Sequence, residues 1–97
     1  MFNEAYDNSQ YISLNAIYTL FKEKNFNYNI GSKTTNDSLS QTLIYSNPIN
    51  KTEKYVINIL NNNNIITEVP LKNTNYYFTS KHTNISNVYN YMKLHIS

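Results

Sequence analysis

Apolar residues recur along this chain with two periods, one typical of helices and one typical of strands. Residues 8–24 carry them at helical spacing, and the principal positions are Leu14, Ile17, Tyr18 and Phe21. A second helical stripe lies near the C-terminus and contains Ile85, Val88, Tyr89, Met92 and Ile96. The pattern therefore predicts a helix from about Asn8 to Lys24 and another near the C-terminus. Either Thr83 or Asn84 can cap the second helix.

Between these helices the clearest feature is a hairpin. The runs Tyr55–Leu60 and Ile65–Val69 are rich in β-branched residues, and four asparagines, Asn61–Asn64, separate them. Asparagine tolerates positive φ and can bond to its own backbone, so this block suits a hairpin tip. The two runs therefore predict paired antiparallel strands at the centre of a sheet.

The remaining strand signals are shorter. Residues 41–46 and 76–79 read as strands, and 26–30 alternates as a short first strand. The polar stretch 32–40 predicts a loop, and Lys81 and His82 are expected in a polar approach to the second helix.

These elements define an α+β domain. Their order is helix, three or four antiparallel strands in a meander, and helix, within a single domain of residues 1–97. Each helix has one apolar face, so both helices should cover the same face of the sheet. The opposite face would then be open to water or to a partner.

The amino-acid composition excludes several kinds of catalytic and metal-binding site. The chain has no cysteine, which excludes disulfides, thiol catalysis and cysteine-based zinc sites. It has eight lysines, no arginine and one glycine, which is typical of an AT-rich gene and accounts for the abundance of asparagine. No apolar run is long enough for a transmembrane helix, and the N-terminus lacks the basic segment of a secretory signal. We therefore expect a cytoplasmic protein in a host cell, without membrane contact.

No constellation of residues predicts catalysis. The two histidines, His82 and His95, are separated by most of the second predicted helix. The six acidic residues show no spacing that suits general acid–base work or a two-metal site. We expect no enzyme activity, no metal site and no cofactor.

Binding to a macromolecule is the remaining interpretation. Tyrosine offers a large contact area with few rotatable bonds, and a net charge of +2 permits an anionic partner. The predicted partner-binding residues are Tyr45, Tyr55, Lys72, Tyr77, Lys81 and His82. Tyr76 and Phe78 alternate with Tyr77 and are expected to pack under the helices.

The element order resembles that of the small anti-CRISPR proteins of phages and mobile elements. The resemblance is carried by Leu14–Ile30 (LNAIYTLFKEKNFNYNI), a polar loop, QTLIYS, the hairpin and the closing helix. It implies a non-catalytic inhibitor that binds a CRISPR effector nuclease stoichiometrically. Inhibitors that imitate DNA are strongly acidic, so the charge of +2 favours contact with guide RNA or with a protein surface.

Two other functions fit the same pattern. A double-stranded RNA-binding domain also has strands between two helices, and Lys72 and Lys81 with nearby tyrosines would serve it. A structural subunit that self-associates through the open sheet face is the third hypothesis. The expected partner is a host protein or ribonucleoprotein complex, with nucleic acid as the alternative, and the chain itself is expected to be a monomer or a homodimer.

Overall fold

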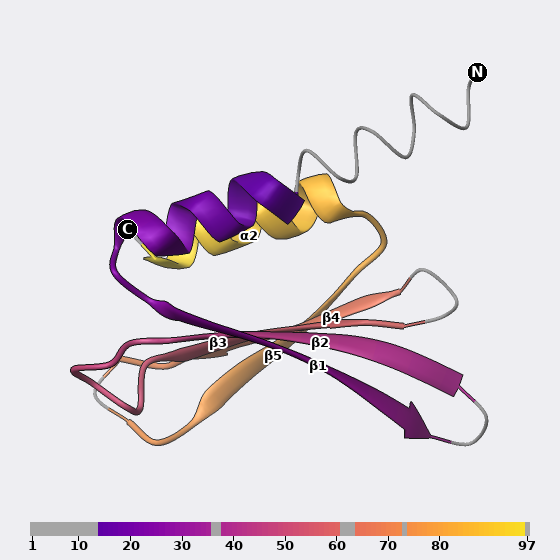
Figure 1. Cartoon of the computed structure of the whole chain (residues 1–97), viewed down its shortest axis with the longest axis horizontal. Coiled ribbons are helices and arrows are strands. Elements are labelled where there is room, and N and C mark those ends of the chain that lie inside the picture. The colour runs from indigo at the N-terminus through magenta and orange to yellow at the C-terminus, as the bar shows by residue number, and fades with distance from the viewer. Residues whose placement is uncertain (1–13, 36–37, 61–63, 73, 97) are drawn as a thin grey trace.

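The computed structural model describes residues 14–35, 38–60, 64–72 and 74–96. In these residues a helix, five strands and a second helix follow one another (Figure 1). The strands form one antiparallel sheet in the order β1-β2-β3-β4-β5, so each strand pairs with its neighbour in sequence. The predicted α+β meander between two helices is confirmed, with five strands where three or four were expected.

The N-terminal helix occupies residues 14–23, and the predicted residues 8–13 lie outside the described part of the chain. It ends in a Schellman motif, in which Asn25 has a positive φ of 64°. The amides of Phe26 and Asn25 donate to the carbonyls of Phe21 and Lys22 at 3.1 and 2.9 Å. The Phe21 and Phe26 rings, 5.4 Å apart, supply the apolar contact of this motif. This cap turns the chain directly into β1.

Strands β1 (Asn27–Thr35) and β2 (Ser38–Ser46) form a long hairpin. Their register is unbroken from Asn27 opposite Ser46 to Thr35 opposite Ser38. The predicted loop at 32–40 is therefore wrong, because 32–35 and 38–40 are strand; positions 36 and 37 lie outside the described residues. The prediction relied on alternating apolar residues, which mark only the first part of the hairpin. Main-chain pairing between β1 and β2 continues beyond that part.

The central hairpin is confirmed. Strands β3 (Lys54–Ile59) and β4 (Ile65–Pro70) pair antiparallel, with Ile59 opposite Ile65. Beyond them the Leu60 amide donates to the Asn64 carbonyl at 2.9 Å. Residues 61–63 of the predicted tip lie outside the described residues.

Strand β5 (Tyr77–His82) is followed at once by helix α2 (Ile85–Ile96). Lys81 and His82 therefore lie in a strand, and their prediction as a polar loop is wrong. The Asn84 side chain caps α2, because its Oδ1 accepts a bond of 2.8 Å from the Asn87 amide. This settles the choice between Thr83 and Asn84.

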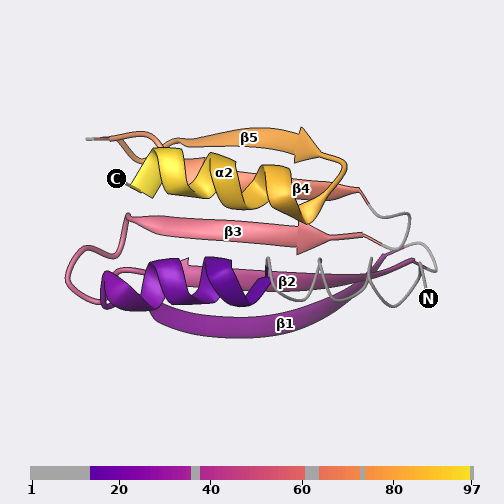
Figure 2. The ribbon, with the colours of Figure 1, turned by 90° about the horizontal axis from the view of Figure 1, so that it is seen from above.

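Both helices cover the same face of the sheet, as predicted (Figures 1 and 2). From above, the N-terminal helix lies over the β1–β2 side and α2 lies over β4 and β5 (Figure 2). The core between the two layers consists of Ile17, Phe21, Leu43, Tyr45, Tyr55, Ile57, Ile65, Val69, Ile85, Val88 and Met92. No described helix covers the opposite face, which we call the open face (Figure 1).

Candidate functional site

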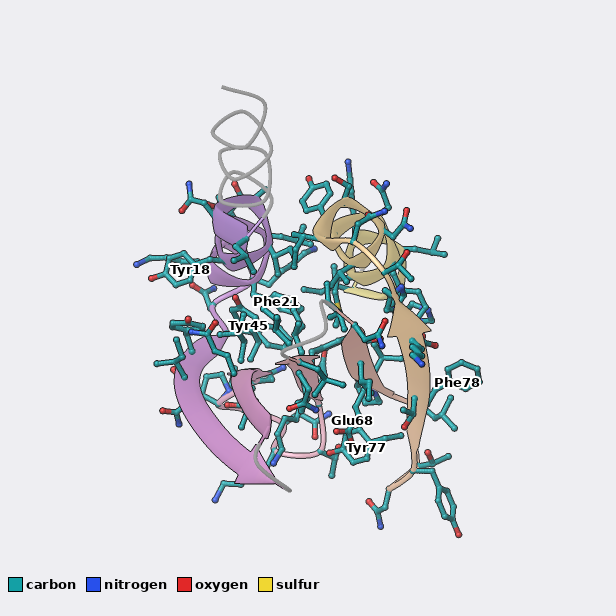
Figure 3. The ribbon with its side chains drawn as sticks, turned by 90° about the vertical axis from the view of Figure 1, so that its right-hand side faces the viewer. Tyr18, Phe21, Tyr45, Glu68, Tyr77 and Phe78 are labelled. Carbon is teal, nitrogen blue, oxygen red and sulfur yellow. The ribbon has the colours of Figure 1, made fainter. Side chains whose placement is uncertain are left out.

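Tyr45 and Tyr55, two of the predicted partner-binding residues, belong to the core. Both are almost completely buried, so their prediction as exposed contact residues is wrong. The Tyr45 ring stacks on Phe21, with centroids 4.2 Å apart and planes within 11° (Figure 3). The Tyr55 ring packs 5.1 Å from Phe21. These rings fill the space between the N-terminal helix and the sheet, which aliphatic side chains fill elsewhere in the core.

Burial also changes the acidity of these phenols. It raises the pKa of Tyr45 well above its ordinary value, and the negative charge that Tyr28 and Tyr18 would carry adds to the effect. Burial likewise raises the pKa of Tyr55, with a contribution from the Glu53 carboxylate. The raised pKa values favour the neutral phenols, and both rings act as packing groups.

His82 lies in a polar cluster between β4, β5 and α2. Its Nε2 is 3.0 Å from the Thr67 hydroxyl, and that hydroxyl also donates to the Ser80 carbonyl at 3.5 Å. The Tyr91 ring of α2 lies 4.8 Å from the His82 ring and 4.4 Å from the His95 ring. Helix packing thus places the Tyr91 ring in contact with both histidines.

A hydroxyl beside an imidazole has the composition of a nucleophile and its base. Here the Thr67 side chain is fully buried, so no substrate can reach its oxygen. The Ser80 hydroxyl is bonded to the Tyr91 hydroxyl at 2.9 Å. Burial lowers the pKa of His82, which favours the neutral ring. The cluster therefore joins α2 to the sheet through polar contacts.

The four other predicted binding residues do not form one site: Lys72, Tyr77 and Lys81 are exposed, whereas His82 is half-buried. Tyr77 and Lys81 both point to the open face of β5, whereas His82 points to the helix side. The Tyr77 hydroxyl crosses to the β2–β3 loop and donates to the Thr52 carbonyl at 3.3 Å. Lys72 lies in the β4–β5 turn. The structure thus places Tyr77 and Lys81 on one strand face and Lys72 and His82 elsewhere.

Sequence reasoning missed an exposed apolar group at the β4–β5 turn, formed by Leu71, Tyr76 and Phe78. The Leu71 amide donates to the Tyr76 carbonyl at 3.0 Å, which extends the pairing of Val69 with Phe78 by two residues. All three side chains therefore lie on the same side of the hairpin. We call this group the aromatic end.

The aromatic end is open because β5 is an edge strand. Tyr76 and Phe78 are 74% and 54% exposed, and Phe78 points outward from β5 (Figure 3). The expectation that they pack under the helices is therefore wrong: α2 lies over β4 and β5 and leaves this outer flank uncovered. The signal that could have found them is the run Tyr76-Tyr77-Phe78 directly after a turn.

A hollow of about 550 Å³ adjoins the aromatic end. The β2–β3 loop, the β4–β5 turn and the end of α2 enclose it, and its wall includes Glu53, Tyr55, Leu71, Lys72 and His95. Leu71 belongs both to the wall and to the aromatic end. The end of the molecule thus combines exposed rings with a recess that has charges of both signs.

Within the described residues, no three histidine, aspartate or glutamate side chains gather where they could hold a metal ion. No described helix is long and apolar enough to cross a membrane. Comparison of the chain with protein-family models, with curated proteins and with solved structures finds no match. The candidate site therefore rests on geometry alone.

Proposed function

We propose that this chain is a binding protein that acts by stoichiometric contact with a host protein or ribonucleoprotein through the aromatic end. The observation that carries the proposal is the exposure of Leu71, Tyr76 and Phe78 side by side on one flank. Contiguous apolar surface of this kind marks interaction sites on small proteins. Aromatic side chains are also enriched among the residues that dominate binding energy.

The neighbouring groups favour a macromolecular partner. The hollow beside the aromatic end supplies Lys72 and Glu53, which can form the polar rim that surrounds an apolar contact. Tyr77 lies on the other face of the same strand, held by its bond to Thr52. The hydroxyl that most resembles a nucleophile, on Thr67, is fully buried, which supports a function without catalysis.

The partner class that we propose is an RNA-guided nuclease complex of the CRISPR type. The support is the element order, helix, antiparallel meander and helix, together with a charge of +2 that is unsuited to imitating DNA. The chain would block such a complex by occupying a protein or guide-RNA surface.

The binding surface can be tested with one double variant and one matched control. Tyr76→Ser with Phe78→Ser removes both rings, whereas Ile30→Ser removes a side chain of similar exposure from the opposite edge of the sheet. Each protein would be used for affinity capture from a low-GC bacterial lysate, and the captured partner would be purified for calorimetry. We expect 1:1 binding that the control retains and the double variant weakens by about tenfold or more.

Each result has a defined meaning. Capture of no specific macromolecule would overturn the proposed function, and equal affinity of the double variant would overturn the assignment to the aromatic end. Cleavage assays with purified effector complexes test the partner class: inhibition should saturate at equimolar protein. A partner unrelated to CRISPR, including free RNA or DNA, would overturn that class.

A further inference from the structure

The free edge of β1 differs from the free edge of β5. β1 is nine residues long and its register with β2 has no bulge. Its first six residues, 27–32 (NYNIGS), contain no charge and no proline. Monomeric proteins usually protect edge strands with lysine, proline, a bulge or short length. β5 follows that practice, because it has six residues and carries Lys81, whereas the lysine of β1, Lys33, comes only after this uncharged segment.

The side chains along β1 are suited to a contact. Tyr28 and Ile30 lie on the helix side of the strand, and both are exposed, Ile30 at 56%. The Tyr28 ring meets Tyr18 of the N-terminal helix edge-on at 5.2 Å. A groove of about 410 Å³ runs between that helix and β1, and Tyr28 and Ile30 form part of its wall. Apolar surface thus lies beside a strand edge that no described strand pairs with.

We propose that a second copy of this chain pairs with β1, antiparallel and edge to edge, to form a closed dimer with a ten-stranded sheet. A twofold axis normal to the sheet can pair a residue only with one on the same face, because side chains alternate along a strand. An axis through Asn29 pairs Asn29 with itself and Tyr28 with Ile30 of the partner subunit. An aromatic ring beside a β-branched side chain is a favourable cross-strand pair.

Two features favour a second copy as the occupant: the segment is self-complementary, since Tyr28 meets Ile30 of the partner subunit, and it is uncharged. The neutral segment 27–32 meets its own copy without like-charge repulsion, although each chain has a net charge of +2. The same pairing leaves the two β5 edges, each with Lys81, at the ends of the extended sheet. Assembly therefore stops at two copies, since the contact is isologous and uses β1 of both chains.

The register can be tested through Asn29, whose side chain is exposed on the open face. The wild-type protein should sediment at twice its chain mass of 11.4 kDa at high concentration. Asn29→Lys and Asn29→Asp each place like charges face to face, and each should raise the dimer dissociation constant by about fivefold. An equimolar mixture of the two should recover a mixed dimer, because the facing charges are then opposite.

Thr79 provides the matched control. It lies in the same row across the sheet as Asn29, through Ile44, Val56 and Glu68, but at the other edge. Thr79→Lys should leave the dimer unchanged. Because the chain has no cysteine, Asn29→Cys and Thr79→Cys each introduce one thiol, and only the first should form a disulfide-linked dimer on mild oxidation.

A wild-type protein that remains monomeric at high concentration would overturn the inference. So would equal cross-linking of both cysteine variants, or mixing that fails to restore association. Binding of a foreign extended peptide to β1, with no self-association, would show that the edge serves another partner. The inference is independent of the proposed function, because the double variant at Tyr76 and Phe78 should still dimerise.

Discussion

At the residue scale, Asn25 determines where the N-terminal helix ends. Its φ of 64° lies in the left-handed region, where most side chains are strained and asparagine is tolerated. The sequence contains a single glycine, at position 31, so asparagine fills the position that glycine usually takes. The conformation is held by the two capping bonds and by the contact between Phe21 and Phe26.

Substitution of Asn25 should therefore change stability in both directions. Asn25→Ala should lower the free energy of unfolding by about 1 kcal/mol, because alanine has a Cβ atom that is strained at this φ and lacks the polar side chain that can hydrogen-bond locally. Asn25→Gly should raise it by a few tenths of a kcal/mol, since glycine adopts this φ freely. Urea denaturation of the three proteins measures both effects. Equal stability of the alanine and glycine variants would contradict the role of the backbone conformation.

His82 should make the stability of the folded protein depend on pH. Burial lowers the pKa of its ring in the folded protein below the ordinary value of 6.5. The unfolded chain then binds more protons than the folded chain between these two pKa values, so stability must rise with pH in that window. The contribution is present above about pH 6.5 and is lost as pH falls through the folded pKa.

Thermal denaturation from about pH 5 to pH 8 should show this loss on the acid side. In His82→Gln the rise in stability with pH should be smaller, because glutamine keeps a polar group near Thr67 but does not titrate. Lys81→Gln, on the other face of the same strand, is the matched control and should keep the wild-type profile. An unchanged profile in His82→Gln would assign the dependence to other groups.

At the element scale, α2 shows how burial follows from helical spacing. Ile85, Val88 and Met92 face the sheet and are buried, and the same stripe was evident in the sequence. Leu94 lies two residues beyond Met92 and is 74% exposed. One helix therefore offers two large apolar side chains in opposite environments.

Met92→Ala should destabilise the protein by about 2–5 kcal/mol, because it leaves a cavity against the sheet. Leu94→Ala in the same helix should change the free energy of unfolding by less than about 0.5 kcal/mol. Both variants keep good helix formers, so their difference reports burial rather than helix propensity. Chemical denaturation measures the two values, and similar values would contradict the observed packing of α2.

Some elements of the fold can be predicted from the sequence and others cannot. The central hairpin and α2 are marked by large apolar residues at regular spacing, and both were predicted. The extension of the first hairpin through 32–35 and 38–40 lacks regularly spaced apolar residues. Main-chain pairing holds those residues in the sheet, and a hydrophobic pattern cannot reveal such pairing. For β2, Leu43-Tyr45 and Ile44-Ser46 are both plausible inward faces, so alternation alone could not show that Tyr45 is buried.

At the scale of the whole molecule, strand order decides which residues are available to partners. A meander leaves its first and last strands at the two edges, and among the described strands these two have a neighbouring strand on one side alone. The exposure of Tyr76 and Phe78 follows from β5 being an edge beyond the cover of α2. The run Tyr76-Tyr77-Phe78 after a turn marks a strand, but it does not show that this strand is an edge beyond the cover of α2, so the sequence left the exposure of its rings open.

The two edges should also differ in hydrogen exchange. In the central strand β3 both sides are paired, so its amides should exchange slowest. In β1 and β5 alternate amides point away from the sheet, and in a monomer these should exchange rapidly at both edges. Dimerisation through β1 should slow the exchange of its outward amides by about tenfold or more as concentration rises, while the amides of β5 keep their rates.

Exchange followed by NMR at two concentrations measures this difference, and Asn29→Lys should reduce the protection of β1. Concentration-independent exchange at β1 would show that its edge remains open to water, whereas selective protection would show that the edge with the uncharged segment 27–32 is the one that pairs.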